Sequence, residues 1–320
     1  MRVVIIDDYS RSVRSLRAFK LLDGDDVTVL HEPITTPAGW QQCLAQAEAL
    51  VLIRERSVID ASVLDHAPHL RIVSCAGALA GTLDLNACNA RGIAVAQSRG
   101  AGHATAELCW AMILASERRL PQQIESLRKG HWQGEIGRQL HGRRLGLWGF
   151  GKIAQKVAQY GRAFGMQVWI WGRESSLDRA RAGGWECAPD RAAFLAQSDI
   201  VSVQLKLNAE TRHGITASDL ILMKSDSLFV NTSRAGLVAP GALEAALDAG
   251  RPGAAAIDVF EDEPVTDPSH SLIGRPNVLA TPHIGFVEQD NYESFFAGAF
   301  ENIRRFEAGE TAHLVNHASL

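Results

Sequence analysis

The sequence has few cysteines, and none of them lies at a spacing typical of metal or disulfide sites. The five are Cys43, Cys75, Cys88, Cys109 and Cys187. An odd, scattered set without a C-x-x-C pair indicates reduced thiols in a cytoplasmic protein and excludes a disulfide framework. The 11 histidines include no i, i+4 pair with a third, carboxylate ligand, so we predict no metal site.

Long apolar runs and an excess of charge are also missing. No stretch approaches the roughly 20 apolar residues that a membrane helix needs. The N-terminus turns acidic at Asp7 and Asp8, too early for a signal peptide. The net charge is −4, which gives no field that would attract nucleic acid or an anionic membrane. We therefore expect a small-molecule ligand, with no nucleic-acid or membrane partner.

Short apolar runs alternate with longer amphipathic stretches through most of the chain. The runs predict strands at Val3–Ile6, Val27–Leu30, Ala49–Ile53, Arg71–Cys75, Ile93–Ala96, Arg144–Trp148, Gln167–Trp171, Ile200–Gln204, Ser227–Asn231, Ala255–Val259 and Val278–Ala280. The stretches between them predict helices at Ser10–Leu21, Pro37–Ala47, Ala104–Leu120, Lys152–Phe164, Ala192–Gln197 and Pro240–Ala249. Strands that are apolar on both faces and alternate with helices are typical of parallel sheets covered on both sides.

This pattern predicts an α/β fold of two Rossmann-like, doubly wound parallel-sheet domains with a cleft between them. A chain of 320 residues exceeds the usual size of a single core. The Gly-rich segment Arg99–Gly102 is a candidate hinge before a long helix. If the last long helix, at Glu288–Glu307, packs back on the first sheet, the first domain is discontinuous. We expect a substrate-binding domain at residues 1–99 plus 289–320 and a dinucleotide-binding domain at residues 100–288.

A glycine-rich turn joins the strand at Arg144–Trp148 to the following helix in the pattern G-x-G-x-x-A. Gly149 permits a tight turn, Gly151 lets the backbone approach a pyrophosphate, and Ala154 allows close packing of helix on strand. Lys152 and Ile153 begin the helix, whose N–H groups would bind the diphosphate. The turn is predicted to bind NAD or NADP, because the strand before it and the apolar helix after it are both present.

The end of the next strand bears on the choice between the two cofactors. A carboxylate that accepts the ribose 2′-hydroxyl is usual in NAD sites, but here Gly172 follows the strand and Arg173 comes next. Arg173 could pair with a 2′-phosphate, whereas Glu174 could turn inward and restore NAD binding. The pattern slightly favours NADP.

Polar residues follow three later strands, where parallel sheets build their sites: Arg234, then Asp258 and Glu263, then His283. Reduction of a 2-oxo acid needs a cation for the carboxylate and the carbonyl, for which a bidentate guanidinium is suited. It also needs a proton donor that titrates near neutrality, which is an imidazole, and a carboxylate that fixes its tautomer. Arg234, His283 and Glu263 match these three roles.

At these residues the chain resembles the D-isomer-specific 2-hydroxyacid dehydrogenase family, the group of phosphoglycerate dehydrogenase and hydroxypyruvate reductase. The matching segments are Gly149–Gly151, Asn231–Arg234, Asp258–Pro264 and Thr281–Gly285. The resemblance implies Arg234 as substrate clamp, His283 as acid/base and Glu263 as its partner. It also implies Asp258 as acceptor for the nicotinamide carboxamide, with Thr232, Ser233 and Gly285 near the cofactor.

The same resemblance implies further roles outside these segments. The backbone N–H groups of Gly77 and Ala78 would bind the substrate carboxylate. Arg54 could face the same cleft, but a surface ion pair with a neighbouring glutamate fits it equally well. Phe286 stands where the family more often has glycine and could narrow the substrate pocket. The loop at Trp132 suggests the arm of a homodimer, although a simple exposed loop fits it too.

We therefore expect an NAD(P)-dependent oxidoreductase that transfers a hydride between nicotinamide and C2 of a small 2-oxo or 2-hydroxy acid of the D series. One alternative is a nucleotide-sensing binding protein or co-repressor on the same fold, which the intact Arg234, Glu263 and His283 disfavour. Another is an amino-acid dehydrogenase, which would need a catalytic lysine, and Lys206 is the nearest candidate. Turnover of 2-oxo acids, with or without ammonia, separates these readings.

Overall fold

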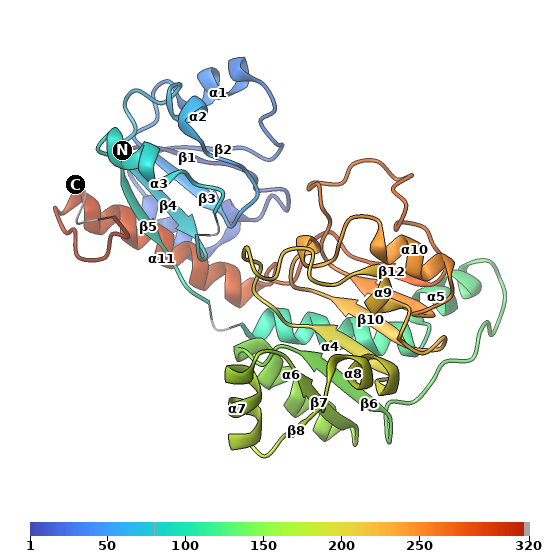
Figure 1. Ribbon diagram of the computed structural model, residues 1–320. Coiled ribbons are helices and arrows are strands. Elements are labelled where there is room, and N and C mark those ends of the chain that lie inside the picture. The colour runs from blue at the N-terminus through green and yellow to red at the C-terminus, as the bar shows by residue number, and fades with distance from the viewer. Residues whose placement is uncertain (80, 101, 317–320) are drawn as a thin grey trace. The chain divides into compact units, whose positions relative to one another are not determined.

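A computed structural model of the chain describes residues 1–79, 81–100 and 102–316. The chain forms two compact units, which Figure 1 shows as ribbons. The split unit comprises residues 1–101 and 288–320, and the central unit comprises residues 102–287. One unit is thus built from both ends of the chain and the other from its middle. Ala101, which falls in the candidate hinge, lies outside the described residues.

Five parallel strands make the sheet in the described part of the split unit, in the order β2-β1-β3-β4-β5. Their bounds are β1 (Arg2–Ile5), β2 (Asp26–Val29), β3 (Ala49–Ile53), β4 (Ile72–Ala76) and β5 (Ala94–Gln97). Every residue of β3 and β4 is buried, because helices cover both faces of the sheet. The chain changes direction between β1 and β3, and such switch points open a crevice at the carboxyl ends of the strands.

Helices cover the two faces of this sheet. On one face α1 (Pro37–Leu44), α2 (Ala61–Leu64) and α3 (Leu85–Ala90) pack into a shared apolar core. On the other face the long C-terminal helix α11 (Gln289–Glu307) contacts β4, β5 and the 3-10 helix η2 (Arg17–Leu22), as Figure 1 shows in red. Since α11 is the last long helix of the sequence, it completes the unit that the first residues begin.

The predicted α-helix at Ser10–Leu21 is wrong. The segment forms two 3-10 helices, η1 (Val13–Ser15) and η2, separated by Leu16 in an extended conformation with φ −69° and ψ 142°. The carboxylate of Asp8 accepts a hydrogen bond from the N–H of Ser12 at 3.1 Å. Such local bonds compete with the helical ladder, and they explain why an apolar period alone was insufficient here.

All strands in the described part of the central unit are parallel and form one sheet in the order β12-β11-β10-β9-β6-β7-β8. Their bounds are β6 (Arg144–Trp148), β7 (Gln167–Trp171), β8 (Glu186–Cys187), β9 (Ile200–Val203), β10 (Leu228–Asn231), β11 (Ala254–Ile257) and β12 (Val278–Ala280). The direction of winding changes between β6 and β9. This is the strand order of dinucleotide-binding domains, with the crevice at that switch point.

Two apolar cores lie on the two faces of the central sheet. One contains side chains of α4 (His103–Glu117), α6 (Lys152–Ala163) and α7 (Glu174–Ala182). The other contains side chains of α8 (Arg191–Gln197), α9 (Ala217–Leu220) and α10 (Ala242–Asp248).

The predicted helix at Ala104–Leu120 corresponds to α4, which ends at Glu117, three residues before the predicted end. The chain breaks at Arg119, which has φ +54°, and α5 (Leu120–Arg128) follows.

The predicted fold class, an α/β chain with two parallel-sheet domains, is confirmed. Four strands have the predicted bounds, and the others differ by one or two residues. β8 was missed because it has only two residues, and β2 alternates in burial because it lies at a sheet edge. No helix in the described part of the chain combines the length and the apolar character needed to cross a bilayer.

Candidate active site

The glycine-rich turn after β6 lies at the switch point of the central sheet. Gly149 has φ +100°, and a Cβ on it would stand 2.6 Å from the carbonyl oxygen of Gln204, which follows β9. Only glycine tolerates both the backbone angle and the approach. The N–H of Gly149 donates to the carbonyl of Trp171 at 2.7 Å, which ties the turn to the end of β7.

The start of α6 has the features of an anion site. Gly151 is the N-cap, makes no side-chain cap, and would meet nothing within 4 Å if it carried a Cβ. Lys152 and Ile153 are the first two helical residues, and Ala154 is fully buried against the core. The N–H groups at the start of α6 have no side-chain cap and open space beside them, so they are suited to bind the diphosphate of a dinucleotide.

The end of β7 carries no carboxylate directed at this turn. A Cβ added to Gly172 would stand 3.6 Å from the backbone of Gly149. Arg173 is the exposed N-cap of α7 and makes no cap hydrogen bond with its side chain. The carboxylate of Glu174 instead accepts a hydrogen bond from Arg181, at 2.6 Å, further along the helix.

The turn after β10 is fixed by Asn231, whose side chain accepts from the N–H of Ser233 and donates to the carbonyl of Arg234, both at 3.0 Å. The hydroxyl of Ser233 donates to Val203 at 2.8 Å. Thr232 is buried, and its hydroxyl lies against the thiol of Cys109.

His283 and Glu263 meet as predicted for an acid/base pair. The Nδ1 of His283 lies 2.6 Å from Oε2 of Glu263, and the other carboxylate oxygen accepts from the N–H of Phe260 at 2.9 Å. Burial acts to raise the pKa of Glu263. The hydrogen bond and charge of His283, the Phe260 N–H and the charge of Arg234 outweigh it and hold that pKa below its usual value.

The charge of Arg234 also contributes to the lowering of the pKa of Glu263. Because Nδ1 of His283 is engaged by Glu263, Nε2 is the ring nitrogen left for a substrate.

The carboxylate of Asp258 is buried at the end of β11. The residue is 0% exposed, and its carboxylate accepts three hydrogen bonds from the loop that carries His283. Burial raises the pKa of Asp258, while the bonds from Thr281, Ile284 and Gly285 oppose that rise. These hydrogen bonds join the carboxylate at the end of β11 to the loop that carries His283.

The side chain of Phe286 is buried and lies edge-on to the ring of His283, with centroids 5.6 Å apart. This placement makes it a support for the imidazole.

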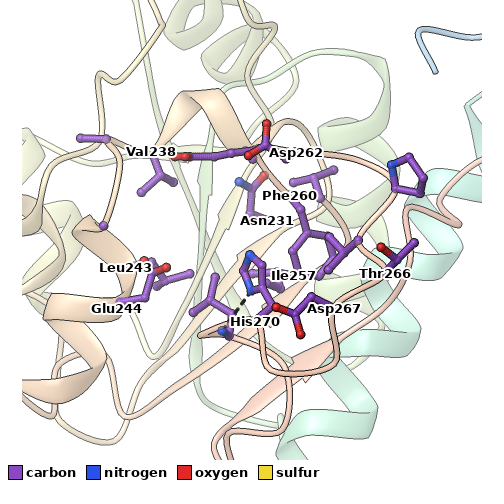
Figure 2. A pocket seen from close by; sticks show the side chains of 18 residues that line it. Asn231, Val238, Leu243, Glu244, Ile257, Phe260, Asp262, Thr266, Asp267 and His270 are labelled. Atoms are coloured by element: carbon purple, nitrogen blue, oxygen red, sulfur yellow. Dashed lines mark hydrogen bonds between the residues drawn. The ribbon is translucent and has the colours of Figure 1, made fainter. Parts of the chain in front are cut away.

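A cavity of ≈ 350 Å³ lies between α10 and the loop after β11, and Figure 2 shows the rings of Phe260 and His270 within it. Arg234, Glu263 and His283 are not among the described residues that line this cavity.

The candidate residues of the split unit follow β3 and β4. The side chain of Arg54 crosses over Gly77, since a Cβ on that glycine would stand 2.5 Å from Arg54 Cδ. The N–H of Gly77 already donates to the hydroxyl of Ser98 at 2.8 Å. Gly77 is buried and Ala78 is exposed, so Ala78 is the better placed of the two expected donors. Arg54 also lies 3.4 Å from Glu55, the ion pair that the sequence left open.

Several supporting residues were not predicted from the sequence. Arg179 of α7 donates to the carbonyl of Phe150 in the glycine-rich turn at 3.4 Å. Thr281 donates to Asp258 at 2.6 Å. Neither could be found from spacing, because each depends on a contact between separate elements. Among the described residues, no three His, Cys, Asp or Glu side chains gather as metal ligands.

Comparison with known proteins agrees with this geometry. Residues 110–285 match the family model described as D-isomer specific 2-hydroxyacid dehydrogenase, NAD binding domain. The chain is 36% identical over 283 residues to a glyoxylate reductase of Aeropyrum pernix, covering 85% of this chain and 83% of that protein. It is 33% identical over 261 residues to a 4-methyl-2-oxopentanoate reductase A of Aspergillus oryzae, covering 80% and 78%.

Among solved structures, the fold is similar to a phosphoglycerate oxidoreductase from Vibrio cholerae o395. The TM-score is 0.94 and the identity 45%, over 97% of this chain and 100% of that one.

Proposed function

Since the chain belongs to the D-isomer-specific 2-hydroxyacid dehydrogenase family, we propose that it works as a reductase of small 2-oxo acids, with Arg234, Glu263 and His283 as its catalytic residues. The family establishes the general reaction, the NAD-linked oxidoreduction of a D-2-hydroxy acid. The observation that supports these residues is the 2.6 Å contact between Nδ1 of His283 and Oε2 of Glu263, and the charge of Arg234 contributes to the lowered pKa of that carboxyl.

Each residue has a distinct part in the reduction. NAD(P)H, when bound, supplies the hydride to C2. The guanidinium of Arg234 binds the substrate carboxylate and polarises the carbonyl, which stabilises the charge that develops on oxygen. His283 delivers a proton from Nε2 to that oxygen. Glu263 holds the Nδ1 proton and compensates the charge of the imidazolium.

A kinetic panel tests this assignment. The purified protein is mixed with NADH or NADPH and with glyoxylate, hydroxypyruvate or 4-methyl-2-oxopentanoate, and the loss of reduced-nicotinamide absorbance is followed. The names of the relatives support these acids as the first to try. Oxidation of the cofactor by at least one acid is expected. If no acid oxidises either cofactor, the result contradicts the proposed activity and favours the alternative of a nucleotide-sensing binding protein.

Arg234→Ala gives a sharper test of the substrate clamp. Because the guanidinium grips both the ground state and the transition state, KM should rise and kcat should fall together. Arg234→Lys is the matched control, since it keeps the charge and loses the bidentate geometry. An effect limited to cofactor affinity would contradict the role.

For the cofactor, NAD is the dinucleotide of the family description, and we propose that this chain prefers NADP(H). The support is the absence of an acidic acceptor among the described residues at the end of β7, where Gly172 and the exposed Arg173 stand. Arg173→Ala should weaken NADPH more than NADH. Gly172→Asp should reverse the preference, because it adds a carboxylate that can accept the ribose 2′-hydroxyl. The new side chain fits, since its Cβ would make only ordinary contacts, the nearest at 3.5 Å from Ser176. Equal effects on both cofactors would refute the preference.

We propose that a second copy of the chain covers α5. No residue of α5 is buried, and Leu120, Ile124 and Leu127, at 45%, 51% and 58% exposure, lie on one helix face. Trp132 and Ile136 after it are 83% and 96% exposed. Sedimentation should show a homodimer that Leu127→Glu dissociates and Leu127→Met does not. A monomeric wild type would contradict this.

For the split unit, we propose that Arg54 and the N–H of Ala78 bind the substrate carboxylate, with Gly77 shaping their loop. This role makes the split unit the substrate-binding domain and the central unit the dinucleotide-binding domain. Arg54→Met should raise KM for the acid and leave the Kd of the cofactor unchanged.

We also propose a reducing, cytoplasmic location, which agrees with the five free cysteines.

A further inference from the structure

The cavity between α10 and the loop after β11 shares its wall with two loops that carry candidate catalytic residues. Its volume of ≈ 350 Å³ lies in the range of about 300–1,000 Å³ that is usual for pockets that bind small molecules. The wall includes Asn231, whose side chain fixes the turn of Arg234. It also includes Phe260, whose N–H donates to Glu263 at 2.9 Å. The cavity is therefore distinct from the candidate catalytic residues but joined to them through two hydrogen-bonded turns.

The inner surface of the cavity is apolar. Its members with no more than 9% exposure include Val238, Leu243, Ile257, Phe260 and Leu272. The ring of His270 lies edge-on to that of Phe260, with centroids 5.2 Å apart. Nδ1 of His270 accepts a hydrogen bond from the N–H of Leu272 at 3.2 Å, so the imidazole is neutral in this geometry. An apolar or aromatic group would be desolvated by this surface without meeting a charge.

The outer part of the cavity carries negative charge. Its acidic members are Glu244, Glu261, Asp262 and Asp267, and the described lining residues include no lysine or arginine. In the view of Figure 2, the carboxylates of Glu244, Asp262 and Asp267 lie on three sides of the cavity. The hydroxyl and the N–H of Ser269 donate to Asp267 and lower its pKa, so that carboxylate is ionised at neutral pH. Such an opening concentrates cations.

The spread of these carboxylates favours an organic cation over a metal ion. Among the described residues, no three His, Cys, Asp or Glu side chains gather as metal ligands. A bare ion would also leave the apolar inner surface without a partner. An ammonium group on an apolar body matches both parts of the cavity, because the charge faces the carboxylates and the body covers Phe260 and Leu243.

We propose that this cavity binds a small organic amine, with an ammonium group on an apolar or aromatic body, and that its occupancy lowers the rate of reduction. Asp262 directly precedes Glu263 in the chain, so an ammonium beside it adds positive charge near the His283–Glu263 pair. A nearby cation disfavours the imidazolium that delivers the proton. The effect on the rate rests on the proposed function, whereas binding of the amine does not.

The first test is calorimetric titration of the whole chain with tryptamine, phenethylamine and hexylamine. Indole-3-propionate is the matched control, because it has the ring of tryptamine and a chain of similar length that ends in the opposite charge. Tryptamine should bind at one site, and the propionate should bind at least about tenfold more weakly. The proposal is wrong if no amine binds with a Kd below about 1 mM, or if the two indoles bind equally.

Variants locate the site. Glu244→Gln and Asp262→Asn should each weaken tryptamine by about 3- to 10-fold, which is the range for a partly exposed ion pair. Glu301→Gln removes an exposed carboxylate of α11 and should leave the Kd unchanged. Ala239→Phe fills the cavity from its wall and should abolish binding, with thermal unfolding used to show that the variant is folded. Wild-type affinity in both charge variants would place the amine elsewhere and overturn the proposal.

Hydrogen exchange and turnover test the link to the catalytic residues. Saturating tryptamine should slow exchange of the Phe260 amide by at least about threefold, because the ligand packs on the residue that donates to Glu263. It should lower kcat about twofold in the wild type and in Glu301→Gln, and not in Ala239→Phe. If the amine binds an active wild type without changing kcat, the inhibitory role is wrong. If the wild type oxidises no cofactor, the proposed function fails, and titration and exchange alone decide whether the cavity binds amines.

Discussion

The two loops that carry the chemistry of the central unit are built in opposite ways. The glycine-rich turn depends on open space. Gly149 and Gly151 have no side chains, no side chain caps the start of α6, and a Cβ on Gly151 would meet no atom within 4 Å. The His283 loop depends on hydrogen bonds that its residues make to the carboxylates of Asp258 and Glu263. We therefore expect added atoms to impair the first loop, in its fold at Gly149 and in cofactor binding at Gly151, and lost hydrogen bonds to impair the second.

Removing the imidazole should have the largest effect. His283→Ala should lower kcat by about 10²–10⁴-fold, because it removes the proton donor. Cofactor binding should survive, since the glycine-rich turn is untouched. Stopped-flow kinetics and fluorescence titration with NADH and NADPH measure the two separately. Near-normal turnover would mean that the acid/base group lies elsewhere.

Adding one methyl group to each glycine of the turn should separate fold from function. Gly149→Ala forces a left-handed alanine into the carbonyl of Gln204 and should cost about 2–3 kcal/mol of unfolding free energy. Gly151→Ala meets no protein atom and should stay within about 0.5 kcal/mol of the wild type. Its cofactor affinity should fall about tenfold if the diphosphate occupies that space. Equal stabilities of the two variants would contradict this contrast.

The low pKa of Glu263 makes a prediction about pH. A carboxyl whose pKa is lowered by folding stabilises the protein above its unfolded pKa, and this contribution is lost as the pH falls through the folded pKa. Glu263→Gln should therefore differ in unfolding free energy from the wild type at neutral pH and approach it in acid. Its kcat should be about tenfold lower, because the imidazolium loses its counter-charge. A difference in stability that is constant with pH would disprove the lowered pKa.

The smallest effect is expected at Phe286. Phe286→Leu removes an edge-on aromatic contact with His283 and should lower kcat about threefold for every acid tested. If the ring narrowed the substrate pocket instead, the variant would gain activity toward bulky acids and keep it toward glyoxylate. Relative kcat/KM for small and bulky acids distinguishes the two.

Much of the fold could be predicted because parallel strands buried on both faces are continuous apolar runs. The strands Ala49–Ile53, Arg144–Trp148 and Gln167–Trp171 have the predicted bounds for this reason. Short or polar elements lacked that signal. The helix α7 opens with Glu174 and two serines and buries only a narrow stripe, and β8 is held by its neighbour β7 alone.

The candidate residues and the pairing of His283 with Glu263 could be predicted from the sequence, but the other contacts of the candidate site could not. Arg234, Glu263 and His283 could be named because each is a polar residue that follows a predicted strand. The engagement of Asp258 by the loop after β12 could not be foreseen, because it joins residues 23 to 27 positions apart through a turn with a left-handed histidine. Likewise, the bond from Gly77 to Ser98 depends on the register of β4 against β5.

The position of α11 has a consequence for the order in which the protein can be assembled during synthesis. Its aromatic face, with Phe295, Phe296 and Phe300 buried, covers strands that leave the ribosome nearly two hundred residues earlier. Until translation reaches this helix, the nascent sheet must expose that apolar surface, while the intervening unit already has all of its own strands. A chaperone that recognises exposed apolar sheet would therefore find its binding site on the oldest part of the growing chain.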